Sequence, residues 1–326
     1  MSQLTLTRAT KAPPAARTVA VVLAVVAAAA SVVTALADPG HGAQDGLALS
    51  GLVLRTTGHL AALGTIGCLV LVLAHQHDRS APPDAVVLRS ASVWASCWAL
   101  VLLFTLILEV VAPDAVATHG SVGPDPADLA ARIRWQIAGV VLACVVRILA
   151  GSARRRADVW LLLGVALVGL IPALAIGHTD TSESGRLVTA ALTVHVVAVS
   201  VWAGGLMALV THHREVWADG RGPRTVRVYS TVALACYVAV GASGLSAVLA
   251  RTDPGAVLDS RAHLALLVSK AAILVGLGVA GGVQRRVVLP RLSERGPEVL
   301  IVVAVAEMVL MATALGLAVT LTHTAS

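Results

Sequence analysis

Several sequence patterns that mark enzymes and pumps are missing from this chain. Its 326 residues contain no HExxH sequence, no GxSxG sequence in a suitable context and no Walker loop. The usual signals of catalysis are therefore lacking, and ATP-driven pumping by this chain alone is not expected. We predict that the protein is not an enzyme.

Cysteine and methionine are scarce as well. Each occurs four times, and neither a Met-rich nor a His-rich outer loop is present to collect metal. The cysteines form no CxxC pair, so they provide neither a disulfide framework nor a zinc signature. A buried free cysteine ordinarily packs like a small hydrophobic residue, and we expect that role here. The four lie in different hydrophobic segments, at Cys68, Cys97, Cys144 and Cys236.

Hydrophobic residues, in contrast, make up 57% of the chain. Their runs repeatedly reach the roughly 20 residues that a helix needs to cross a bilayer. They are too long and too continuously apolar for barrel strands, which alternate. We therefore predict an all-α polytopic protein of the lipid bilayer. The nine expected spans are 19–37, 51–73, 90–112, 129–150, 158–176, 187–210, 229–250, 263–283 and 298–321.

The charges predict the orientation of these spans. Arginine and lysine gather in alternate loops, as at Arg154 to Arg156 and Arg285, whereas the opposite loops hold acids such as Asp125 and Glu183. The positive-inside rule then places the N-terminus in the cytoplasm. The net charge of +6 is explained by the cationic residues of the cytoplasmic loops, and no nucleic-acid partner is expected. Span 19–37 also has features of a cleaved signal peptide, but its long apolar run favours an anchor.

Comparison of the chain with itself suggests an internal repeat. His195 follows His59 by 136 residues, and a glycine pair or near-pair follows each. The Gly-His-Thr sequence around His178 likewise resembles the Thr-His-Thr sequence around His323. Transporters often place a site between such repeats. The predicted arrangement is one leading helix (19–37) followed by two four-helix units in parallel orientation (51–180 and 187–326).

Four histidines form the predicted metal site. His59 and His195 lie inside the membrane, about 13 Å from the outer surface at the helical rise, whereas His178 and His323 lie near that surface. Neutral imidazole binds copper, zinc, nickel and haem iron. If His59 pairs with His178, and His195 with His323, the pairs could instead be axial ligands of haem. The remaining alternative is hydrogen bonding across helix interfaces.

The last predicted span carries a second cluster. Glu307 lies well inside it, and Met308 and Met311 follow within about one turn. Thioethers select cuprous copper, although methionine in a membrane helix usually serves packing. A carboxylate at this depth needs a partner, and we expect a buried ion pair between Glu307 and Lys270 of the preceding span. That pair would be either a structural link or part of an ion path.

Histidines also occur at the inner ends of the predicted spans. His75, His77, His212 and His213 stand beside arginines there. They are candidates for a cytoplasmic release site for metal. The alternative is a solvated face of the membrane helices.

One stretch resembles a known family. His195 is followed by Trp202, Gly204, Gly205 and Leu206, which resembles the His, then Trp-x-Gly-Gly-Leu, pattern of the bacterial copper resistance protein D family. The resemblance covers about residues 155–295. It continues through later sequences in the family's order, namely Arg227-Val-Tyr229-Ser230, Ala242-Ser243-Gly244-Leu245, Leu267-Val-Ser-Lys270 and Gln284-Arg285-Arg286.

This resemblance implies a function in copper handling. Proteins of the family are inner-membrane proteins implicated in moving copper between periplasm and cytoplasm, often beside a small periplasmic copper-binding protein. Some members are fused to a cytochrome oxidase assembly domain, which implies an oxidase-assembly protein as a further partner. The expected function is copper transport or delivery across a bacterial plasma membrane. A haem-binding redox protein and a membrane assembly scaffold are the alternatives.

Overall fold

The computed structural model describes residues 44–76, 82–111, 126–171, 183–251, 261–292 and 298–324, and all the regular structure in these ranges is helical. The prediction of an all-α fold is thereby confirmed. The leading span 19–37 and His178 lie outside the described residues. The helices are α2 (Gln44–His75), α3 (Ala85–Val111), α5 (Pro126–Ala150), α6 (Arg156–Val168), α8 (Glu183–Thr211), α9 (His213–Ala218), α10 (Gly222–Arg251), α12 (Arg261–Val283) and α14 (Glu298–Thr324).

Within the described ranges, six helices are long and apolar enough to cross a membrane, so the chain is a multi-pass membrane protein. They are α2, α3, α5, α8, α10 and α12, and each overlaps one predicted span. The other three predicted spans are not fully covered by the description, which omits residues 172–176 after α6 and the side chains of α14 beyond Met311. The total of nine therefore stays a prediction.

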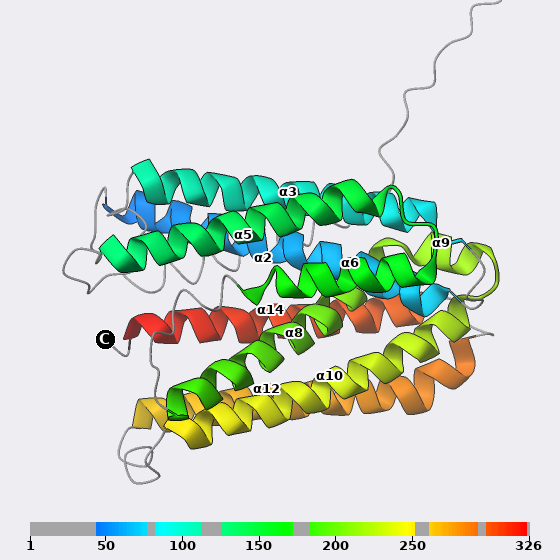
Figure 1. The fold of residues 1–326 in the computed structure, drawn as a ribbon. Coiled ribbons are helices and arrows are strands. Elements are labelled where there is room, and N and C mark those ends of the chain that lie inside the picture. Colours follow the sequence, from blue (N-terminus) through cyan, green and yellow to red (C-terminus); the bar gives the residue numbers. More distant parts are fainter. Residues whose placement is uncertain are drawn as a thin grey trace, which may run out of the picture.

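The helices form two groups, and the contacts within each group follow the same pattern. In the first group, α2 contacts α3 and α6, and α5 contacts the same two helices. In the second, α8 contacts α10 and α14, and α12 contacts those two. The groups meet mainly where α2 packs on α8, and all the long helices run side by side along one direction (Figure 1). The internal repeat itself remains a prediction.

Glycines let the two groups touch backbone to backbone. A Cβ on Gly67 of α2 would lie 1.9 Å from the carbonyl oxygen of Gly204 in α8. In return, a Cβ on Gly204 would lie 2.4 Å from the carbonyl oxygen of Leu63. Small residues at a membrane helix interface permit this close approach. Gly204 of the Trp-x-Gly-Gly sequence thus positions α8 against α2.

The surface of the bundle is apolar where it would face lipid. Large aliphatic side chains such as Leu100, Ile148, Val238 and Leu249 are exposed on α3, α5 and α10. The interior holds its own apolar core, with Ile66, Leu69 and Val146 fully buried. Lipid tails are as apolar as these side chains, so such a surface suits a bilayer.

Polar contacts tie the inner ends of the helices together. His75 of α2 contacts the Thr225 hydroxyl through Nδ1 at 3.0 Å and a carboxylate oxygen of Asp219 through Nε2 at 3.1 Å. Burial acts to raise the pKa of Asp219, but hydrogen bonds from Arg221 and the charge of His75 outweigh it and lower that pKa. Asp219 is therefore ionised at neutral pH and holds α2 to the segment before α10. His77 lies outside the described residues.

Candidate functional site

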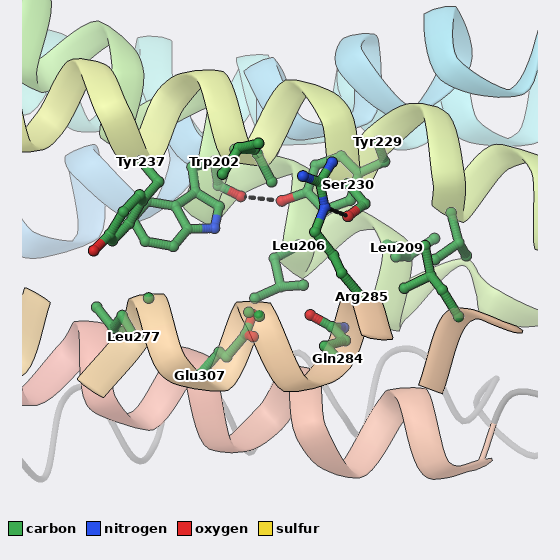
Figure 2. Close-up of a pocket in the computed structure, with 17 residues that line it drawn as sticks. Trp202, Leu206, Leu209, Tyr229, Ser230, Tyr237, Leu277, Gln284, Arg285 and Glu307 are labelled. Atoms are coloured by element: carbon green, nitrogen blue, oxygen red, sulfur yellow. Dashed lines mark hydrogen bonds between the residues drawn. The ribbon is translucent and has the colours of Figure 1, made fainter. Parts of the chain in front are cut away.

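A cavity of about 130 Å³ lies among the four helices of the second group. Apolar side chains of α8 and α10 form most of its wall, and glycines of α12 leave room on the opposite side. Its polar groups come from three elements that are distant in sequence (Figure 2). They include Tyr229, Ser230 and Tyr237 of α10, Gln284 and Arg285 after α12, and Glu307 of α14.

Glu307 is the buried ionisable group of this cavity. It lies on the face of α14 that also carries Leu300 and Ala304, and all three residues are at most 5% exposed. This face packs inward because its residues are spaced by about one helical turn. Within the described part of the chain, Glu307 Oε1 is buried and accepts no hydrogen bond. A carboxylate oxygen is thus directed into the bundle without compensation from those residues.

The predicted partner of Glu307 cannot be placed, because the side chain of Lys270 is not among those described. Glu307 shares the cavity with Gly278 and Gly281 of α12. Lys270 lies about two turns outward from Gly278 on the same helix, roughly 12 Å by helical rise. The ion pair between Lys270 and Glu307 stays a prediction.

The ring of Tyr229 packs directly against Gly205 of α8. Its hydroxyl donates a hydrogen bond to the carbonyl oxygen of Trp202 at 2.5 Å. A Cβ on Gly205 would lie 2.4 Å from the Tyr229 ring, so only glycine leaves space for it. Trp202 in turn meets Tyr237 edge to face, with ring centroids 5.8 Å apart. The Trp-x-Gly-Gly sequence therefore shapes the wall of the cavity.

Replacing Tyr229 with Phe should cost about 1 kcal/mol of unfolding free energy, the net value of one hydrogen bond. Gly205→Ala should cost more, about 1–3 kcal/mol, because the added methyl group overlaps the Tyr229 ring. Thermal unfolding of the two purified variants in detergent measures both effects. If Tyr229→Phe loses more unfolding free energy than Gly205→Ala, the conclusion that only glycine at position 205 leaves space for the Tyr229 ring is contradicted.

The end of α12 turns two polar side chains into the cavity. After Val283 the chain forms a π-helical turn over Gln284–Val288, followed by a short 3₁₀ turn over Leu289–Arg291. Such turns are often found at functional sites. Arg285 Nε donates to the Ser230 hydroxyl oxygen at 2.8 Å and so joins this turn to α10. Figure 2 shows Gln284 beside Glu307, whereas Arg285 extends toward Ser230 and Tyr229 of α10.

His195 lies on the cavity-lining face of α8, outward from the cavity. It precedes Trp202 by seven residues, which is two helical turns. The imidazole is half-buried, and its Nδ1 is 3.2 Å from the Ser243 hydroxyl oxygen in α10. That hydroxyl can donate its hydrogen to the Val240 carbonyl oxygen, 3.1 Å away, and in that arrangement it accepts from Nδ1–H. The lone pair of the imidazole is on Nε2 in this tautomer.

The other predicted histidine ligands are not brought together by the described residues. The side chain of His59 is exposed, and α2 and α8 diverge toward their N-terminal ends (Figure 1). His178 lies outside the described residues, and only the backbone of His323 is described. The four-histidine site and the haem pairs therefore stay predictions. Within the described ranges, no group of three or more His, Cys, Asp or Glu side chains is placed to share a metal ion.

Met308 and Met311 of α14 are half-buried and pack against the hydrophobic core. Met311 also contacts the small cluster that includes Trp202 and Leu277. These contacts are the ordinary packing role of methionine. A role of the thioethers in an ion path stays a prediction.

The fold and the cavity define a helical membrane protein with an ionisable side chain buried in its second helix group. The family model described as Copper resistance protein D matches residues 223–321, which hold α10, α12 and most of α14. Residues 223–321 are thus similar to the copper resistance protein D family, and the resemblance seen in the sequence is confirmed from residue 223 onward, but not for His195 and the Trp-x-Gly-Gly sequence, which lie before the match. Among curated proteins and among solved structures, none matches the chain. Glu307 and most of its cavity lie inside the matched region.

Proposed function

We propose that the protein moves copper ions across a bacterial plasma membrane, by transport or delivery, and that this movement contributes to copper resistance. The observation that carries this proposal is Glu307. Its carboxylate is buried in a membrane helix, has an oxygen without a partner among the described residues, and faces a cavity that lies mostly within the stretch similar to copper resistance protein D. Ionisable groups at such positions usually serve ion or proton pathways.

The route suggested by the geometry follows one face of α8. A copper ion captured at His195 would pass inward along α8 by about two turns to Trp202, which lines the same cavity as Glu307. A cation that leaves water for the bundle loses its hydration, and a nearby carboxylate offsets part of that cost. Gln284 and Arg285 lie at the inner side of this route, where α12 ends.

Partners follow from the same proposal. A periplasmic copper-binding protein would supply the ion at the end of the bundle near His195. An oxidase-assembly protein is a candidate recipient. The haem alternative is not favoured by any contact of the described residues, and the scaffold alternative predicts that no metal binds at all.

Copper analysis of the purified protein, together with its optical spectrum, tests this proposal. Replacing His195 with Ala should abolish the outer copper site. Ser243→Ala should weaken it by about 10–100-fold, the usual effect of removing a group that orients a metal-binding histidine. Ser246→Ala is the matched control, because that exposed hydroxyl bonds only its own helix at Ala242.

The outcomes separate the three classes of protein. Loss of one bound copper in His195→Ala, with no loss in Ser246→Ala, supports the proposal. A Soret band that disappears in His195→Ala would replace copper with haem. A protein that binds neither metal would favour the scaffold function.

A further inference from the structure

A second polar cluster lies where α2 meets the inner end of α8. The Sγ atom of Cys68 in α2 is 3.9 Å from Nε2 of His212, the residue that follows α8. Cys68 is 1% exposed and His212 is 6% exposed. Neither residue lines the cavity of Glu307. A thiol and an imidazole thus face each other in a part of the protein closed to water.

The other nitrogen of His212 faces a carboxylate. Its Nδ1 is 3.9 Å from Oε2 of Glu215, and both atoms are buried without a hydrogen-bond partner among the described residues. Buried polar atoms are normally paired, so this arrangement requires an explanation. At 3.9 Å no hydrogen bond joins the two atoms, but the charge of the carboxylate favours a proton on the nearby Nδ1 and therefore a lone pair on Nε2, the nitrogen that faces Cys68.

We propose that Cys68 and His212 bind monovalent copper at the inner end of the bundle, with Glu215 orienting the imidazole. Thiolate selects cuprous copper, and imidazole also binds it. The inference rests on the proposed function, because copper that crosses the membrane needs a ligand before its release. The site lies on the side where the positive-inside rule places the cytoplasm.

The charges of this site suit a monovalent ion. When the bond between Sγ and copper forms, the S–H bond breaks and the proton leaves toward water past Glu215, whose side chain is 34% exposed. The copper keeps its oxidation state. A thiolate and a monovalent cation together carry no net charge, so the occupied site leaves no uncompensated charge beside the fully buried Ile66 and Leu69.

The distances suit a site with two protein ligands. Bonds of about 2.0–2.3 Å, typical of nitrogen and sulfur ligands to a metal of this size, reach both atoms across the 3.9 Å separation. Structural zinc almost always takes four ligands. No group of three or more candidate ligands is present among the described residues. A pair therefore favours cuprous copper, which accepts a low coordination number.

Titration of the full-length detergent-solubilised protein with Cu(I) under reducing conditions, against a colorimetric Cu(I) chelator, tests the site. We expect Cys68→Ala to lose one bound Cu(I) and to lose the sulfur ligand detected by X-ray absorption. Glu215→Gln should retain the ion with about 10–100-fold weaker affinity. Cys236→Ala is the matched control, because Cys236 is also buried, at 9% exposed, and has no hydrogen-bonded histidine among the described residues.

The outcomes distinguish this site from the proposed function. If Cys68→Ala binds as much Cu(I) as the unmodified protein, or if the bound ion has no sulfur ligand, the site is overturned whatever the transport result. If vesicles with the unmodified protein pass no copper while Cys68 still binds Cu(I), the transport function fails and the site stands. Near-ultraviolet circular dichroism of each variant verifies that a lost ion does not reflect an unfolded bundle.

Discussion

Cells that express the Glu307→Gln variant are expected to lose copper movement through this protein. Glutamine keeps the shape of the side chain but removes the charge that offsets the desolvation of an ion in the cavity. Leaving a buried ion without its counter-charge costs about 3 kcal/mol or more. Because each 1.36 kcal/mol changes a rate about tenfold, the copper flux should fall by at least roughly a hundredfold. Metal analysis of washed cells after a copper pulse measures this effect.

Glu298→Gln provides the matched control for this experiment. Glu298 begins the same helix, α14, but is exposed and lies outside the cavity. Its replacement should leave the cellular copper content unchanged. Equal copper content for Glu307→Gln and the unmodified protein, at equal expression, would remove Glu307 from the ion path.

A methyl group at Gly67 is expected to separate the two helix groups. The added carbon would lie 1.9 Å from the carbonyl oxygen of Gly204, and backbone atoms cannot move aside as a flexible side chain can. Overpacking a core costs about 1–3 kcal/mol and occasionally more. We expect Gly67→Ala to be at or beyond the upper end of this range. Its unfolding temperature in detergent should fall well below that of the unmodified protein.

Two other helical glycines serve as controls for Gly67. Among the described residues, no atom of a neighbouring element lies within 4 Å of a Cβ added to Gly164 of α6 or Gly276 of α12. Alanine is the better helix former by about 1 kcal/mol, so these variants should be neutral or slightly stabilised. If Gly67→Ala unfolds at the same temperature as Gly276→Ala, the close contact between α2 and α8 is not a determinant of stability.

The sequence predicted the helices better than their ends. Apolar runs mark the part of a helix inside the bilayer, and predicted and observed spans overlap for that reason. The helices themselves continue into polar residues that the hydrophobic pattern does not include. Helix α3 begins at Ala85 instead of residue 90, because Asp84 accepts hydrogen bonds from the backbone of Val86 and Val87. Helix α10 likewise begins at Gly222 instead of residue 229.

The candidate site was only partly visible in the sequence. A carboxylate inside an apolar run is conspicuous, and Glu307 is indeed buried. The contact between Ser243 and His195 was not predicted, because Ser243 stood out in the sequence only as part of the Ala242-Ser243-Gly244-Leu245 motif. The two residues are 48 positions apart, and their contact depends on which faces of α8 and α10 meet.

The contact of Cys68 with a distant histidine was even harder to predict from the sequence. Its residue type predicted packing, and its position gave no sign of the histidine 144 residues away. The inner histidines had been considered as a group, but they have different surroundings. His75 bonds Thr225 and Asp219, whereas His212 faces Cys68 and Glu215. Periodicity along one helix does not specify such contacts between helices.

Copper flux into sealed vesicles tests the central claim most directly. The purified full-length protein is inserted into lipid vesicles that contain a fluorescent copper chelator, and copper is added outside. We predict copper entry well above that of protein-free vesicles, with Glu307→Gln vesicles close to the protein-free rate. Copper entry no faster with the protein than without it, in vesicles whose protein still binds copper, would contradict transport by this chain.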